Sequence, residues 1–386
     1  MFDSRRVVRI HLGHHFYGAG NLGDDFMLAG FVGAMRTLAP EAKFTACVPF
    51  DLAPLRARFP TIEWLGYDEA TRRSAIRQCD LWLGLGGSPF QSAQSRWFID
   101  HLVGDQAMCA ESDRPMFYLG IGVQTQAELA VADAQKLCEC TAAIWTRDAS
   151  SADRLTSLPR RPNKVTAAAD LAHLYFRTNP PPLAASGRLT LVANFDYNSW
   201  SGQVACLQAI HTYSSTARIS EQVWLAQESR ELPGAERALF ASLSPDQQAR
   251  WRLIIPDAPT RSEAAAHSPG VSSPTLPLSS VLERWPSGEY LVTARFHAAF
   301  AGAWAGSKVV VIATNEKLRA AARDLACPLI EPDADEATVL HALEAAAPVP
   351  RDRLLRLADQ AHAACADFVR LITASRSAVA PDHGTP

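Results

Sequence analysis

The chain has 386 residues, of which 48% are apolar and 20% are charged, and its formal net charge is −3. This length predicts two domains, each large enough to bury its own core, and the composition is typical of a folded protein. Because the net charge is slightly negative, no global basic field exists to attract nucleic acid or an anionic membrane surface. Nucleic acid is therefore excluded as a partner, and any anion must be bound at a local site.

The cysteines and the most apolar segment indicate neither a disulfide framework nor a membrane span. Eight cysteines are scattered, and the only close pair, Cys138 and Cys140, has no second pair near it, which argues against a zinc site. The N-terminus lacks the long apolar region of a signal peptide, and the apolar residues 298–314 are interrupted by two glycines and Lys308. We therefore expect a cytoplasmic protein, with any membrane association peripheral and at the inner face.

Short strand-like runs alternate with helical segments in the first half of the chain. The expected strands cover residues 7–13, 43–50, 80–87, 115–123 and 142–148, and two of the expected helices cover residues 24–38 and 127–140. Such alternation predicts the α/β class, with parallel strands, right-handed crossovers and helices on both faces of the sheet.

A Pro-rich stretch divides the chain. Residues 176–188 contain three prolines and show neither a helix nor a strand pattern, and further strands follow at 188–195, 251–257, 289–295 and 308–314. Residues 256–280, rich in Pro and Ser, predict a mobile loop, and residues 351–373 predict a long helix. We therefore expect an N-terminal domain at 1–178, a C-terminal α/β domain at 187–350, a C-terminal helix at 351–374 and a flexible tail at 375–386.

The first candidate site is the Gly-rich turn at residues 18–25, between the first strand and its helix. Small residues let backbone N–H groups approach a ligand, and a helix N-terminus favours an anion or a hydroxyl-rich group. The alternative is that Asn21 or Asp24 only caps the helix. Gly18, Gly20 and Gly23 spell G-x-G-x-x-G, but no acidic residue closes a second strand about 20 residues later, which disfavours a nicotinamide cofactor.

Glycines also follow two later strands. Gly84, Gly86 and Gly87 precede Ser88, and residues 120–122 end another strand with two glycines. Strands of a parallel sheet end at one edge, where open α/β folds bind ligands, so these turns predict ligand lining rather than ordinary chain reversal.

Arg295 and His297 mark a third candidate site, between a strand and a helix rich in small residues. A guanidinium, an imidazole and free backbone donors at a helix start would suit an anion. Lys317, one strand later, either adds a second cation or is a solvated surface residue.

Three histidines, His11, His14 and His15, lie near the first turn. No carboxylate spacing near them is typical of a metal site, so we interpret them as polar lining and expect no metal.

Together these segments resemble the polysaccharide pyruvyl transferase family. The matching segments follow the family's order and extend over roughly residues 9–324: residues 20–25 (GNLGDD), 86–88 (GGS), 120–123 (GIGV), 147–151 (RDASS), Asp170, 295–298 (RFHA) and 315–317 (NEK).

The resemblance implies two Rossmann-like domains that face a central cleft, similar to GT-B glycosyltransferases. It implies transfer of a pyruvyl group from phosphoenolpyruvate to a sugar or lipid-linked glycan acceptor, as a step in building an exopolysaccharide, capsule or cell-wall glycan, with no cofactor or metal. The catalytic residues it implies are Asp24, Arg295 and His297. The substrate-binding residues are Gly20, Asn21, Gly86, Gly87, Ser88, Arg147 and Lys317.

Two alternatives remain open from the sequence. One is a glycosyltransferase of the same architecture, which would bind the diphosphate of a nucleotide sugar with Arg295 and Lys317. The other is a non-catalytic glycan-assembly protein that keeps the fold.

Overall fold

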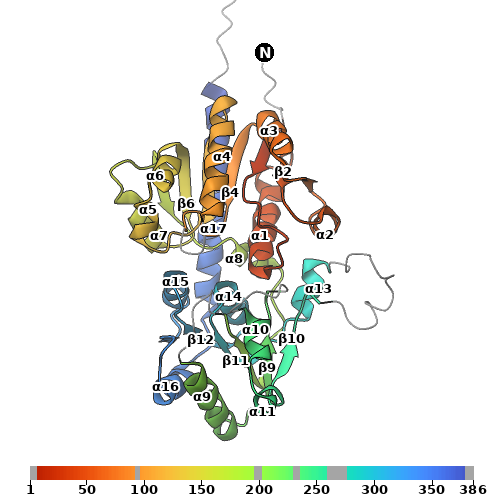
Figure 1. The fold of residues 1–386 in the computed structure, drawn as a ribbon, viewed down its shortest axis with the longest axis vertical. Helices are drawn as coiled ribbons and strands as arrows, with labels where there is room; N and C mark the ends of the chain where they lie inside the picture. The colour runs from red at the N-terminus through yellow and green to blue at the C-terminus, as the bar shows by residue number, and fades with distance from the viewer. Residues whose placement is uncertain (1–6, 92–95, 195–201, 229–234, 259–275, 379–386) are drawn as a thin grey trace, which may run out of the picture.

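The computed structural model describes residues 7–91, 96–194, 202–228, 235–258 and 276–378. Residues 375–378 are described by their backbone only. Two parallel β-sheets lie one above the other in the long direction of the molecule (Figure 1). The α/β architecture expected for both halves of the chain is confirmed.

The first sheet has seven strands in the order β3-β2-β1-β4-β5-β6-β7. Its strands are β1 (Arg9–Leu12), β2 (Lys43–Cys47), β3 (Ile62–Leu65), β4 (Leu81–Leu85), β5 (Met116–Ile121), β6 (Thr141–Thr146) and β7 (Lys164–Ala167). The helices of this half are α1 (Leu22–Leu38), α2 (Leu52–Arg58), α3 (Glu69–Gln78), α4 (Trp97–Glu111), α5 (Gln126–Leu129), α6 (Ala132–Glu139), α7 (Ala149–Thr156) and α8 (Ala172–Thr178).

The second sheet has six strands in the order β10-β9-β8-β11-β12-β13. Its strands are β8 (Ala185–Val192), β9 (Glu221–Leu225), β10 (Arg252–Ile254), β11 (Gly288–Thr293), β12 (Lys308–Ile312) and β13 (Leu329–Ile330). The helices here are α9 (Gln203–Thr216), α10 (Glu236–Ala241), α11 (Pro245–Gln248), α13 (Leu278–Glu283), α14 (Phe296–Ala305), α15 (Glu316–Leu325), α16 (Glu336–Ala345) and α17 (Arg351–Ala378).

Local sequence explains where the helices at the ends of strands begin. Asn21 caps α1, with its Oδ1 accepting from the Gly23 N–H at 3.2 Å, and Asp148 caps α7 by accepting from the Ser151 N–H at 2.7 Å. Helix α14 is buried along its whole length, and its many alanines let it lie close to β11 and β12. The starts of these helices are thereby held at fixed points on the sheet edges.

The prediction of a single helix over residues 127–140 is wrong, because two helices occupy this segment. Helix α5 ends at Leu129, and Val131 is extended (φ −71°, ψ 129°) before α6 begins. The break lets Leu129 and Leu137 pack into one apolar cluster beneath the sheet. The burial of these two side chains outweighs the local preference of the sequence for one continuous helix.

The Pro-rich stretch is more ordered than expected. Its first residues belong to α8 and its last to β8, so only residues 179–184 lie outside regular structure. Most of the loop expected at 256–280 lies outside the described residues, and its end, from Leu278, is helical.

The C-terminal helix α17 returns to the first sheet (Figure 1). Phe368 contacts Phe117 and Trp145, with ring centroids 5.8 Å apart in both cases, and the Trp145 indole donates to Asp367 at 2.8 Å. The helix continues to Ala378, beyond the tail expected from residue 375, and the rest of that tail lies outside the described residues. No helix in the described part of the chain is long and apolar enough to cross a membrane.

Candidate functional site

Residues that follow strands of the first sheet contact residues that follow strands of the second. Gln227, after β9, donates from Nε2 to the Asn21 Oδ1 at 3.1 Å, and Glu228 forms an isolated antiparallel bridge with Asn21. The carboxyl ends of both sheets therefore meet, and we call this region the inter-domain junction.

Asn21 and Asp24 occupy the start of α1 at this junction. The Asn21 amide donates to Asp24 Oδ2 at 3.0 Å, so Asn21 both caps the helix and contacts the other domain. Burial raises the pKa of Asp24 to about 7, the charges of Asp25 and Glu228 raise it further, and Lys317 and Arg295 oppose them. Asp24 can therefore take up or release a proton near neutral pH.

His297 faces Asp170 across the junction. The distance from His297 Nε2 to Asp170 Oδ2 is 3.5 Å, and the other carboxylate oxygen of Asp170 accepts from the Ala172 N–H at 2.8 Å. Burial alone would raise the pKa of Asp170, but the charges of His297 and Arg147 hold it below its usual value. Asp170 is therefore an ionised, buried partner that orients the imidazole.

Gly23 makes this placement of His297 possible. A Cβ atom on Gly23 would lie 2.0 Å from the His297 Nδ1, far inside van der Waals contact. The imidazole therefore packs directly on the first turn of α1, and a glycine is required there.

Arg295 lies among carboxylates rather than facing open space. Its Nε donates to Glu236 Oε1 at 2.7 Å, its Nη2 donates to Glu236 Oε2 at 3.3 Å, and Glu228 lies 3.8 Å from the same Nη2. Both carboxylates are buried, so a large part of the charge of Arg295 is balanced within the second domain.

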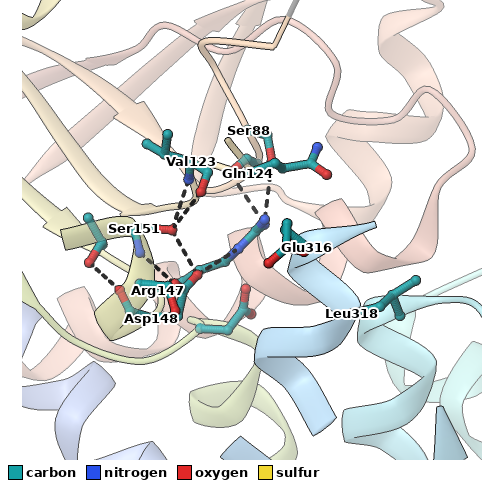
Figure 2. Close-up of polar contacts among 12 residues, drawn as sticks. Ser88, Val123, Gln124, Arg147, Asp148, Ser151, Glu316 and Leu318 are labelled. Carbon is teal, nitrogen blue, oxygen red and sulfur yellow. Dashed lines mark hydrogen bonds and ion pairs between the residues drawn. The ribbon is translucent and has the colours of Figure 1, made fainter. Parts of the chain in front are cut away.

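Figure 2 shows Arg147 reaching from the end of β6 towards the Gly-rich turn after β4. Its two Nη atoms donate to the Gly87 carbonyl at 3.3 Å and to the Ser88 hydroxyl at 3.1 Å. On its other side the guanidinium lies 4.6 Å from the centre of the Phe296 ring. Arg147 thereby connects the first domain to the start of α14.

The predicted site residues divide into two groups. Asn21, Asp24, His297, Arg295 and Lys317 are brought together at the junction, by direct contact or by the electrostatic effect on Asp24. Gly86, Gly87 and Ser88 form the neighbouring turn after β4, where both glycines have a positive φ (70° and 73°), and Gly20 also has a positive φ of 93°.

The three N-terminal histidines lie in the core instead. The ring of His15 contacts His101 at 4.0 Å between centroids, and that of His14 contacts Phe98 at 5.2 Å. Burial lowers the pKa of His11 to about 4, that of His14 to about 3 and that of His15 to about 2, so all three are neutral packing groups.

Sequence reasoning missed Gln227, Glu228 and Glu236. Glu228 lies three residues after the end of β9, so the strand-end criterion that selected Gly86 and Arg295 would have found it. No local sequence motif identifies Glu236, because its role depends on a contact with Arg295, 59 residues further along the chain.

Several buried polar atoms at the junction have no hydrogen-bond partner among the described residues. They are Arg147 Nε, Gln227 Oε1 and the two facing atoms Asp170 Oδ2 and His297 Nε2, which form an ion pair at 3.5 Å but no hydrogen bond. Eight other described residues carry such an atom as well, so these atoms alone do not mark the junction. Their combination with the buried charged groups Asp24 and Asp170, whose pKa values are shifted, indicates a place for a polar ligand.

No protein-family model and no curated protein matches this chain in sequence. Solved structures match its fold. S. aureus MnaA with UDP has a TM-score of 0.60 at 10% identity, over 97% of this chain and 98% of that one. The UDP-GlcNAc 2-epimerase of Methanocaldococcus jannaschii has a TM-score of 0.58 at 10% identity, over 96% and 100%. Anabaena HepE with UDP-glucose has a TM-score of 0.55 at 10% identity, over 96% and 99%. This likeness confirms a GT-B-like fold of two Rossmann-type domains.

The resemblance to polysaccharide pyruvyl transferases is therefore wrong. The matching structures, which extend over nearly the whole chain, are named for UDP-N-acetylglucosamine 2-epimerases or for complexes with UDP and UDP-glucose. The predictions of pyruvyl transfer and of phosphoenolpyruvate as the donor, which followed from this resemblance, are therefore wrong as well. The physical reason is that short motifs such as GGS or RFH are set by the geometry of strand-to-helix turns. Many two-domain Rossmann-like proteins have such turns although they bind different ligands.

Proposed function

We propose that the chain is an enzyme that binds a nucleoside diphosphate sugar at the inter-domain junction and changes the sugar by acid–base chemistry. The observation that carries the proposal is that buried titratable groups from both domains, the His297–Asp170 pair and Asp24, lie at one junction, and that the pKa of Asp24 is raised to about 7. Structures of the same fold were obtained with UDP and with UDP-glucose, which supports a nucleotide sugar as the ligand.

The second domain, which we place at residues 187–350, suits the diphosphate. Helix α14 begins at Phe296, and the preceding residue, Arg295, does not cap it with its side chain; α15 carries Lys317 in its first turn. Because helix N-termini and lysine both stabilise an anion, we place the diphosphate between the starts of these two helices. Arg295 then acts as a positioning residue, since its guanidinium is already bound by Glu236.

The first domain, which we place at residues 1–178, suits the sugar. Asn21 and Ser88 offer an amide and a hydroxyl to sugar hydroxyl groups, and Arg147 holds the Ser88 hydroxyl in place. Asp24, with its pKa near 7, lies beside Asn21 and is the group best suited to exchange a proton with the sugar ring.

We infer that the reaction is an epimerisation. Inverting the ring carbon next to the anomeric carbon needs a group that removes its proton while the bond from the anomeric carbon to the diphosphate breaks and the diphosphate takes up the electron pair. A second group then returns a proton on the opposite face while that bond forms again, with no net change in composition. Asp24 and the His297–Asp170 pair supply two such groups from the two domains. In this proposal one nucleotide sugar is converted into another, and no second substrate is required.

Incubation with UDP-GlcNAc or UDP-glucose, followed by proton NMR of the sugar signals in deuterated water, tests the proposal. We expect a new set of ring signals and incorporation of deuterium at the inverted carbon. Release of UDP only when an acceptor sugar is added would instead favour glycosyl transfer. If neither UDP nor either nucleotide sugar raises the unfolding temperature of the protein, the binding proposal itself is wrong.

A further inference from the structure

A cavity of about 670 Å³ lies beneath helix α3, on the face of the first sheet formed by β1, β2 and β3. Figure 1 shows α3 at the end of the first domain far from the second sheet, so this cavity is separate from the inter-domain junction. The residues that line it include Arg9, Lys43, Thr45, Glu63, Ser74 and Gln78. Its volume is within the range of small-ligand sites, roughly 300–1,000 Å³.

The sheet face that forms the floor of this cavity is polar. Arg9 is in register with Lys43, and Thr45 is in register with Glu63, so their side chains lie on the same face of three adjacent strands. The alternate residues, such as Ile10, enter the apolar core on the other face. Strands of a doubly wound parallel sheet are normally apolar on both faces, so this polar face departs from the rule.

Helix α3 does not fill the space above these strands. It presents small side chains to the cavity, Ala70, Thr71 and Ser74 among them, and only Ala75 and Ile76 of the helix are buried. Arg9, Lys43, Glu63, Ser74 and Gln78 are exposed, so this space is an open groove that a ligand can enter from solvent. The polar floor and the small side chains of α3 leave room for a polar ligand in this groove.

The charges of the lining select an anion. The lining contains two cations, Arg9 and Lys43, and one carboxylate, Glu63. Neither cation forms an ion pair with another described residue. Hydroxyl groups of Thr45, Thr71 and Ser74 and the amide of Gln78 lie around them; the Thr45 hydroxyl lies 3.0 Å from His11 Nδ1. Cations suit a phosphate or carboxylate, and the hydroxyls and the amide suit a polyol.

We propose that this cavity is a second ligand site, for a small phosphorylated sugar. It is independent of the proposed reaction at the junction, because it shares no residue with it. The phosphate lies between Arg9 and Lys43, and the sugar hydroxyls bind Glu63, Ser74 and Gln78.

Isothermal titration of the full-length protein with glucose 6-phosphate, ribose 5-phosphate, glucose and inorganic phosphate tests this site. We expect one of the two sugar phosphates to bind, and glucose and inorganic phosphate to bind at least ten-fold more weakly. Lys43→Gln and Arg9→Gln should each weaken binding about ten-fold or more, since each removes a charge-assisted contact. Ser74→Phe, which fills the cavity, should abolish it.

Arg73→Gln is the matched control, because Arg73 lies on the same helix but pairs with Glu69 and Glu111 outside the cavity. It makes the same charge change and should leave the affinity unchanged. If Lys317→Gln at the junction abolishes binding while Lys43→Gln does not, the ligand occupies the junction and this proposal is wrong. Absence of binding by both sugar phosphates at millimolar concentration, or equal affinity for inorganic phosphate, overturns it as well. These outcomes do not depend on whether the protein epimerises a nucleotide sugar.

Discussion

His297 of the second domain and Asp170 of the first lie 3.5 Å apart, measured from Nε2 to Oδ2, although 126 positions separate them in the sequence. Asp170 is 1% exposed, so this carboxylate interacts mainly with the protein and not with water. The imidazole is thereby oriented from the opposite domain, which the acid–base role that we propose for His297 requires.

His297→Gln should lower turnover of the nucleotide sugar by about 10² to 10⁴, because a general acid–base group is lost while the amide occupies a similar volume. The rise in unfolding temperature caused by UDP should persist, since we place UDP at the helix starts. Asp170→Asn should also lower turnover and should shift the pH profile, which loss of packing alone would not do. Near-normal turnover in His297→Gln would leave this residue as a packing group only.

Gly23→Ala should displace the His297 ring, because the added methyl carbon would lie 2.0 Å from Nδ1. We expect turnover to fall at least about ten-fold, a loss comparable to that from a misplaced catalytic group. Gly33→Ala is the control on the same helix, where an added Cβ has no neighbour within 4 Å. It should leave turnover unchanged and raise the free energy of unfolding by about 0.5–1 kcal/mol. Equal activity in both variants would contradict the close packing of His297 on α1.

The raised pKa of Asp24 predicts how stability depends on pH. The folded protein holds this proton up to about pH 7, whereas the unfolded chain releases it near the ordinary value of 3.8. The unfolded state therefore binds fewer protons between these values, and the contribution of Asp24 to stability falls as pH rises through that window.

Asp24→Asn removes this effect. The free energy of unfolding of the variant, relative to that of the native protein, should increase by up to about 4 kcal/mol between about pH 4 and pH 7. Denaturant unfolding of both proteins across this range measures the difference. Parallel stability curves for the two proteins would show that Asp24 titrates at its ordinary pKa.

Arg58 connects the two domains through buried ion pairs with Asp25 and Asp257 and through two hydrogen bonds to the Leu276 carbonyl, at 3.1 and 2.9 Å. Arg58→Leu would leave both carboxylates buried without a counter-charge, so we expect the free energy of unfolding to fall by about 3–5 kcal/mol.

Arg56→Leu is the control for this change. Arg56 lies on the same helix and is exposed, with one hydrogen bond to the Trp64 carbonyl at 3.3 Å. Its loss should lower the free energy of unfolding by about 1 kcal/mol or less. Urea unfolding distinguishes the two expectations, and equal losses would show that the inter-domain ion pairs contribute little.

The sequence by itself determined the α/β class, the order of most elements and the glycines at strand ends. These features are local: hydrophobic periodicity is set by neighbouring residues, and a turn such as Gly86-Gly87 needs backbone angles that glycine adopts most readily. Asn21 could be identified for the same reason, since a helix cap depends on residues within one turn.

Only the tertiary structure decided which of these residues act together. No local pattern encodes which distant segments come together. Three such contacts are those of Arg295 with Glu236, of His297 with Asp170, and of helix α17 with the first sheet. The break between α5 and α6 arose from burial of Leu129 and Leu137 in one cluster. The resemblance to pyruvyl transferases was misleading for the same reason, because motifs at strand ends describe the shape of the chain and not the ligand that it binds.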